Sequence, residues 1–212
     1  MVEPIGAGPG LEAAIVSARS ALATEAAAIE RFAESSEAAL RSAVELLLAC
    51  SGRVVVSGLG KSGHVGAKIA ATLSSTGTPA FFMHATEALH GDFGGLLATD
   101  VLVALSNSGE TQEVVAVARH AVAHGVPVIS IVSVRDSSLA ALSTVVIDTR
   151  ARAEADPLGV APTTSTTVTL AAGDALACAL MTARGFTRAD FLERHPAGSL
   201  GSMLGQEAAG AR

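Results

Sequence analysis

Short, almost uninterrupted Val/Ile/Leu runs that alternate with longer helical segments are the strongest constraint on how this chain can fold. VLVAL (101–105) and VPVISIV (126–132) lack polar alternation, which is typical of strands buried on both faces of a parallel sheet. The pattern predicts strands near 53–58, 79–83, 101–105, 127–132 and 144–148, and helices near 62–76, 111–124, 137–141 and 164–184. It therefore favours an α/β fold: a doubly wound, mainly parallel five-stranded sheet flanked by helices in a flavodoxin-like three-layer sandwich.

The segment from residue 11 to about residue 50 precedes this alternation and has a different pattern. It is rich in Ala, Glu and Leu at helical spacing, and Glu34, Ser35 and Ser36 interrupt that spacing. We expect two helices here. Their apolar faces need a partner, which can be the α/β core or a second copy of the chain.

Composition excludes several classes of function. The net charge is -6 and aromatic residues make up 3% of the chain, which disfavours nucleic-acid binding. Cys50 and Cys178 lie far apart within apolar helical patterns, so we expect buried free thiols and no metal or redox pair. The N-terminus lacks a basic and then apolar leader, and no apolar run looks long enough to cross a membrane. These features predict one cytoplasmic, soluble domain.

A glycine-rich turn, VVVSGLGKSGHVG (54–66), follows the first expected strand. Gly58, Gly60 and Gly63 form a G-x-G-x-x-G pattern, as in dinucleotide-binding turns. Such a site also needs an acidic residue about 20 positions after the first glycine, where Thr78 and Pro79 stand. The pattern alone therefore does not predict a dinucleotide site.

The same turn also fails the test for a nucleoside-triphosphate loop. Lys61 and Ser62 complete the GKS end, but the earlier glycine that the motif requires is Val55. What remains is a tight turn that presents a lysine and a serine at a helix start, where backbone amides can hold an anion. The alternative is a solvated Lys61 that points away from the turn.

Two further hydroxyl-rich segments precede helices. SNSGET (106–111) offers Ser106, Asn107, Ser108 and Thr111 with backbone amides to one phosphate, and simple helix capping is the alternative. PTTSTT (162–167) would be taken for capping if it stood alone. Three such helix starts in one parallel sheet favour a polar sugar phosphate held from several sides, because ligands bind beyond the carboxyl ends of the strands.

Ionisable residues gather in loops that follow other strands. HATEALHGD (84–92) contains two histidines and two carboxylates and is a candidate metal site. Glu110 and Glu113 open a helix, where acidic residues suit the helix dipole. Glu154 follows the fifth strand. His195, near the C-terminus, either makes a structural hydrogen bond or reaches a neighbouring subunit's pocket.

Taken together, the motifs resemble the D-arabinose 5-phosphate isomerases of the sugar isomerase (SIS) superfamily. The resemblance runs from about residue 52 to residue 201 through GLGKSGHVG, STGTP, HGDFG, SNSGET, DPLGVAPTTSTT, GDALA, RGFTRADF and HPAGSLG. It implies interconversion of D-ribulose 5-phosphate and D-arabinose 5-phosphate through an enediol, without a cofactor. It also implies a homotetramer with active sites between subunits.

The resemblance assigns site residues by motif. The implied catalytic residues are Lys61, His90, Glu113, Glu154 and His195. Lys61 would stabilise negative charge, while Glu154 and His195 would divide the roles of base at carbon and proton shuttle at oxygen, in an order left open. The implied phosphate ligands are Ser62, Ser106, Asn107, Ser108 and Thr111. No metal is expected to be required, and an ion near His90 would inhibit.

The expected domain organisation follows from the same comparison of motifs. We expect a disordered tail at 1–10, a single SIS domain at 11–205 and a C-terminal tail at 206–212, with N-terminal helices at 11–51 and the α/β core at 52–205. Many members of the family continue into paired CBS domains, which are expected to be missing here. Two alternatives stay open: an isomerase of a hexulose or heptose phosphate, and a sugar-phosphate sensor without catalysis.

Overall fold

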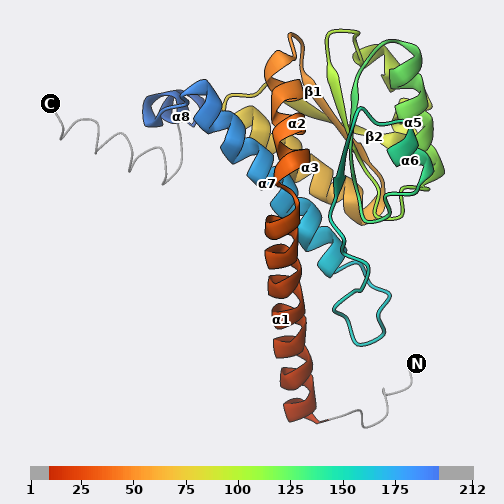
Figure 1. The fold of residues 1–212 in the computed structure, drawn as a ribbon, viewed down its shortest axis with the longest axis vertical. Coiled ribbons are helices and arrows are strands. Elements are labelled where there is room, and N and C mark those ends of the chain that lie inside the picture. Colours follow the sequence, from red (N-terminus) through yellow and green to blue (C-terminus); the bar gives the residue numbers. More distant parts are fainter. Residues whose placement is uncertain (1–9, 196–212) are drawn as a thin grey trace, which may run out of the picture.

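The computed structural model describes residues 10–195 and has a central five-stranded sheet (Figure 1). Its strands are β1 (Val54–Gly58), β2 (Ala80–His84), β3 (Val101–Leu105), β4 (Val128–Val132) and β5 (Val145–Asp148). Their order is β2-β1-β3-β4-β5, and every neighbouring pair is parallel. The predicted doubly wound α/β class is therefore confirmed, with strand ends within one residue of those expected.

Helices surround the sheet and account for most of the remaining chain. They are α1 (Leu11–Ser35), α2 (Glu37–Ala49), α3 (Gly60–Ser75), α4 (Ala85–Ala88), the 3₁₀ helix η1 (Asp92–Gly95), α5 (Gln112–Ala123), α6 (Ser138–Ala141), α7 (Thr164–Arg184) and α8 (Arg188–Arg194). The predicted break in the N-terminal helical segment is confirmed at Ser36, between α1 and α2. Sequence analysis placed no helix at α4, η1 or α8, which are at most seven residues long.

The two faces of the sheet carry separate apolar cores. Val54 and Val56 of β1 face a core formed with α1, α2, α3 and α7. Val55, on the opposite face, packs with residues of α4, α5 and α6. The central strands β1, β3 and β4 are buried along their whole length, which explains their continuous apolar sequences.

Helix α7 crosses the first of these cores and departs from one expectation. By length and mean hydropathy, 1.3 over its most apolar window, it could span a membrane, although sequence analysis expected no such segment. Its residues Val168, Ala172 and Leu176 pack into the core shared with α3 and the N-terminal helices. We therefore treat it as a core helix of the fold.

Both cysteines have free thiols, as expected, but their burial differs from the expectation. Cys178 is exposed on α7, so the prediction of a buried thiol was wrong for this residue; Cys50 is partly buried. Cys178 faces away because the core side of α7 is occupied by Leu176 and Leu180. Of the expected tails, residues 1–9 and 206–212 lie outside the described residues, as does 196–205 of the expected domain.

Candidate active site

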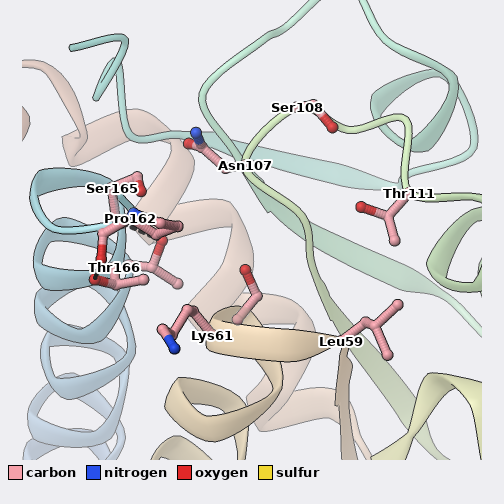
Figure 2. A pocket seen from close by; sticks show the side chains of 10 residues that line it. Leu59, Lys61, Asn107, Ser108, Thr111, Pro162, Ser165 and Thr166 are labelled. Atoms are coloured by element: carbon pink, nitrogen blue, oxygen red, sulfur yellow. Dashed lines mark hydrogen bonds between the residues drawn. The ribbon is translucent and has the colours of Figure 1, made fainter. Parts of the chain in front are cut away.

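A pocket of about 270 Å³ opens at the carboxyl end of the sheet, where α3, the β3–α5 loop and α7 meet (Figure 2). Its lining residues are Leu59, Lys61, Ser62, Asn107, Ser108, Thr111, Pro162, Ser165, Thr166 and Thr169. The three segments are those that carry hydroxyl-rich helix starts in the sequence. This volume suits a small polar metabolite and is small for a dinucleotide.

The glycine-rich turn forms one side of the pocket. Gly60 has a left-handed backbone with φ of 59°, which a side chain would disfavour, and α3 begins at this residue. The N-cap residue of α3, Leu59, makes no capping hydrogen bond with its side chain. Lys61 is exposed beside the pocket, and within residues 10–195 its ammonium group makes no ion pair. Free amides and a free cation at one helix start suit an anion.

The SNSGET loop forms the adjoining side and is held in shape by Ser106. This serine is buried; its hydroxyl accepts a hydrogen bond from the amide of Gly109 at 3.1 Å and lies 2.9 Å from the hydroxyl of Thr111. Gly109 has φ of 71°, again in the left-handed region. Ser106 therefore supports the loop, whereas Ser108 and Thr111 line the pocket itself.

Asn107 is anchored from behind by hydrogen bonds to Ser133, the residue that follows β4. Its amide oxygen accepts a hydrogen bond from the hydroxyl of Ser133 at 2.5 Å, and its backbone oxygen accepts one from the Ser133 amide at 2.9 Å. The Asn107 NH₂ group keeps its two protons for the pocket that the residue lines.

Glu154 lies behind the third side of the pocket and caps the start of α7. One carboxylate oxygen accepts hydrogen bonds from the amides of Thr163 and Ser165, at 2.8 and 3.1 Å, and from the Thr163 hydroxyl at 3.3 Å. The other accepts one from the hydroxyl of Ser165. Burial raises the pKa of Glu154, but these hydrogen bonds together outweigh it, so the pKa lies below its ordinary value. Glu154 is connected to the pocket through Ser165.

Two threonines on α7 complete this third side. The Thr166 hydroxyl donates to the backbone oxygen of Thr163 at 2.9 Å and more weakly to that of Pro162 at 3.3 Å. The Thr169 hydroxyl donates to the backbone oxygen of Ser165 at 2.8 Å. Such bonds to the preceding helical turn are common for Thr. They leave only the oxygen lone pairs of these hydroxyl groups for a ligand.

Several predicted site residues lie outside this pocket. His90 is exposed in the turn after α4, and Glu113 is partly buried in the first turn of α5. Glu110 points to α6 and accepts the Ser138 amide at 2.7 Å, which lowers its pKa. The candidate metal site at 84–92 is not supported: within residues 10–195, no three His, Cys, Asp or Glu side chains come together as a metal site.

His195 lies beyond the opposite end of α7. The pocket lies at the start of α7, a 21-residue helix about 30 Å long, and α8, which ends at His195, lies beyond the other end of that helix (Figure 1). Its ring stacks on Phe191 with centroids 3.9 Å apart, and Nδ1 lies 2.9 Å from the Phe191 backbone oxygen. The structural hydrogen bond that was one of the two expectations is therefore present.

Sequence reasoning missed five lining residues as individual ligands: Leu59, Pro162, Ser165, Thr166 and Thr169. A signal for three of them was available, because the PTTSTT segment was recognised as hydroxyl-rich. Thr169 lies two residues beyond that segment. Leu59 carries no polar atom on its side chain, so no chemical signal could have singled it out.

Fold and pocket together define a doubly wound α/β protein with a polar ligand pocket at the carboxyl edge of its sheet, and comparison with known families identifies the class. The SIS domain family matches residues 47–179, which is more than half of the chain. The chain belongs to this family.

Individual relatives narrow the comparison. The chain is 56% identical over 162 residues to arabinose 5-phosphate isomerase KdsD of Pseudomonas aeruginosa and 51% identical over 162 residues to KdsD of Escherichia coli K12. The matched part is 76% of this chain and 50% and 49% of those proteins, so the chain spans about half the length of the curated relatives it matches.

A solved structure shares the fold over nearly its whole length. A protein of E. coli CFT073, in complex with arabinose 5-phosphate, has a TM-score of 0.82 and 40% sequence identity. The match covers 86% of this chain and 97% of that one. The five-stranded parallel core and its helices are thus shared with a relative that binds a sugar phosphate.

Proposed function

We propose that this protein is an aldose-ketose isomerase that interconverts D-ribulose 5-phosphate and D-arabinose 5-phosphate through an enediol. The observation that carries the proposal is the pocket, in which a lysine without an ion pair among the described residues and the starts of two helices adjoin a row of hydroxyl groups. The relatives described above supply the substrate: two are named arabinose 5-phosphate isomerases, and one was solved with arabinose 5-phosphate bound.

The reaction moves one proton between adjacent carbons and another between their oxygens. It needs a base over carbon, a proton carrier at oxygen and a fixed phosphate. In this proposal, Ser62 on α3 and Asn107, Ser108 and Thr111 on the SNSGET loop hold the phosphate, and Ser106 supports that loop. Lys61 stabilises the negative charge that develops on oxygen.

Glu154 and His195 divide the two proton transfers, and as the base at carbon Glu154 would begin as an ionised carboxylate. Its hydrogen bonds from α7 keep it in that form, because they lower its pKa. His90, in the turn after α4, and Glu113, in the first turn of α5, follow the carboxyl ends of β2 and β3 and are proposed to contact the substrate or its neighbours there.

The proposal includes a homotetramer whose active sites lie between subunits. Two features support it: His195 is too far from its own pocket to act there, and α1 has exposed large apolar residues. Leu11, Ile15, Val16 and Leu22 are at least half exposed on a part of α1 that extends past the α/β body (Figure 1). Such unpartnered apolar surface is typical of subunit contacts.

The cellular setting is proposed on the same basis. We place the enzyme in the cytoplasm, since D-ribulose 5-phosphate is a phosphorylated metabolite that does not cross membranes freely. We also propose that catalysis needs no metal ion, and that an ion bound at His90 inhibits. A divalent-metal titration of the chelator-treated enzyme checks both statements: activity restored by one metal would contradict them.

The test follows deuterium during turnover. Purified protein is incubated with D-ribulose 5-phosphate in deuterated water and followed by NMR, beside Glu154→Gln. We expect D-arabinose 5-phosphate deuterated at carbon 2, and none from the variant. If the variant still exchanges deuterium at carbon but forms no product, Glu154 acts at oxygen and His195 is the base.

Failure has a defined meaning in the same experiment. Turnover of a hexulose or heptose phosphate in place of the pentulose phosphate would mean that the proposed substrate is wrong and that the proposed reaction type is right. No turnover of any of these, together with an increase in melting temperature on adding them, would make the protein a sugar-phosphate sensor.

A further inference from the structure

The hydroxyl groups around the pocket differ in what they can still do for a ligand. Some already donate their proton in a hydrogen bond to another protein atom, and these offer a ligand only oxygen lone pairs. Others keep a proton to donate. Because a phosphate oxygen accepts hydrogen bonds and a sugar hydroxyl can both donate and accept them, this difference decides which part of a ligand each side can bind.

The hydroxyl groups on the α7 side of the pocket can only accept hydrogen bonds from a ligand. Ser165 donates to Glu154, Thr166 to the backbone oxygen of Thr163, and Thr169 to the backbone oxygen of Ser165. All three are lining residues. Each hydroxyl has a single proton, so what remains toward the cavity is oxygen lone pairs. We call Ser165, Thr166 and Thr169 the acceptor wall; Figure 2 shows Ser165 and Thr166 on one side of the pocket.

The start of α7 also cannot bind a phosphate in the way that helix starts often do. Glu154 already occupies the amides of Thr163 and Ser165. Its carboxylate adds a negative charge directly behind Ser165. A phosphate on this side would find these two amides already occupied and would face a like charge.

The SNSGET loop can donate hydrogen bonds. The Asn107 NH₂ makes no hydrogen bond to the described residues, because the amide oxygen is the group that binds Ser133. Lys61, on α3, adds three protons with no ion pair among the described residues. The Ser108 hydroxyl accepts from the Glu110 amide at 3.2 Å and so keeps its own proton. We call Asn107 and Ser108, both in the SNSGET loop, the donor wall; Figure 2 shows Ser108 across the cavity from Ser165 and Thr166.

The starts of the two helices on the donor side complete the contrast. The N-cap residues of α3 and α5, Leu59 and Thr111, make no capping hydrogen bond with their side chains, and both residues line the pocket. The pocket thus has one side built for an anion and one side built for hydroxyl groups.

We propose that the acceptor wall reads the hydroxyl groups of the sugar while the donor wall holds its phosphate, which sets the direction in which the substrate enters. This inference rests on the proposed function and extends it to residues on α7 for which no role was assigned. It makes Thr166 and Thr169 specificity-determining: they favour a polyhydroxylated chain over inorganic phosphate or a deoxygenated analogue.

The test compares two ligands in binding calorimetry. D-Arabinitol 5-phosphate has no carbonyl group and cannot be isomerised, and inorganic phosphate has no carbon chain. Thr169→Val keeps the side-chain shape but removes the lone pairs. We expect it to weaken D-arabinitol 5-phosphate about 5-fold and to change inorganic phosphate less than about 2-fold. We expect Ser108→Ala to weaken both ligands by the same factor.

Matched controls separate ligand contact from helix stability. Thr182 on α7 makes the same kind of bond, to the Cys178 backbone oxygen at 3.1 Å, but lies several turns away near the end of the helix. Thr182→Val should leave both affinities unchanged. Thr169→Ser restores the hydroxyl and should restore D-arabinitol 5-phosphate binding. Melting temperatures of all variants confirm that each is folded.

The outcomes are distinct. If Thr169→Val lowers the affinity for both ligands equally, or for neither, the role proposed for the acceptor wall is wrong. This holds even where the wild-type protein isomerises D-arabinose 5-phosphate in a parallel assay. If the wild-type protein neither isomerises that sugar nor binds D-arabinitol 5-phosphate, the proposed function itself fails. Selective loss that Thr169→Ser restores supports the inference.

Discussion

Glu154 makes the pocket dependent on a single carboxylate, because it holds the start of α7 through Thr163 and Ser165. The folded-state pKa of Glu154 is below its ordinary value. The stabilisation is therefore present above the unfolded pKa of about 4.3 and is lost as pH falls through the folded value. Ser165 can act in the acceptor wall only while this carboxylate is ionised.

We expect Glu154→Gln to lower the free energy of unfolding by about 1 kcal/mol at pH 7, as for the loss of other helix caps. The difference from wild type should shrink as pH falls below about 4.3, because the wild-type carboxylate then becomes protonated as well. Urea unfolding at several pH values measures it. Glu45→Gln on α2, whose carboxylate is exposed and makes no hydrogen bond among the described residues, is the control. A difference that stays constant with pH would contradict the capping role.

At the scale of elements, the crossing of α3 and α7 places Lys61 and Thr166 on facing sides of one pocket. The two helices approach closely at Gly173, where an added Cβ would come within 2.5 Å of Cδ1 of Ile69. Ile69 is fully buried in the core, so it has little room to move. The position of the lysine relative to the α7 hydroxyl groups thus depends on a glycine about two turns from the site.

We expect Gly173→Ala to destabilise the fold by about 1–2 kcal/mol, since the cost of overpacking exceeds the gain in helix propensity. Denaturant unfolding measures this, and Gly94→Ala, where the added Cβ has no neighbour within 4 Å, is the control. Because the helices must separate, substrate affinity should fall as well. A stabilised Gly173→Ala protein would show that Ile69 adapts without cost.

At the scale of the whole molecule, Lys61 and His195 lie at opposite ends of α7. If both act in one reaction, they must come from different copies of the chain. We therefore expect Lys61→Met and His195→Ala to be inactive alone and to recover about a quarter of wild-type activity when mixed and reassembled as dimeric units. Light scattering of each protein checks that it assembles.

The outcome separates two arrangements of the site. Recovered activity means that a wild-type pocket forms from the intact halves of two variants. A fully active monomer, or an active His195→Ala protein, would remove His195 from catalysis and leave its ring as part of the α8 structure, stacked on Phe191.

Several features follow from sequence pattern alone, for physical reasons that are local. The five strands were predicted because continuous apolar runs such as VLVAL can be buried only between two helical layers. The turn at Gly60 and the break at Ser36 were predicted because glycine and short polar residues determine local backbone geometry. The short helices α4, η1 and α8 were missed because such short segments carry too little periodicity.

Tertiary structure alone decided which polar side chains share a pocket and what each can still offer. The hydroxyl groups of Ser106, Ser108 and Thr169 look alike in sequence but differ in the structure. The Ser106 hydroxyl supports a loop, and the Ser108 hydroxyl keeps its proton for a ligand. The Thr169 hydroxyl donates its hydrogen bond to the helix backbone. Residue type determines that a group can form hydrogen bonds, and only its neighbours in space determine which bonds are already made. For the same reason, the sequence by itself determined the parallel α/β fold and its ligand-binding edge, while packing decided that Glu154 caps α7 and that His195 lies a helix length away.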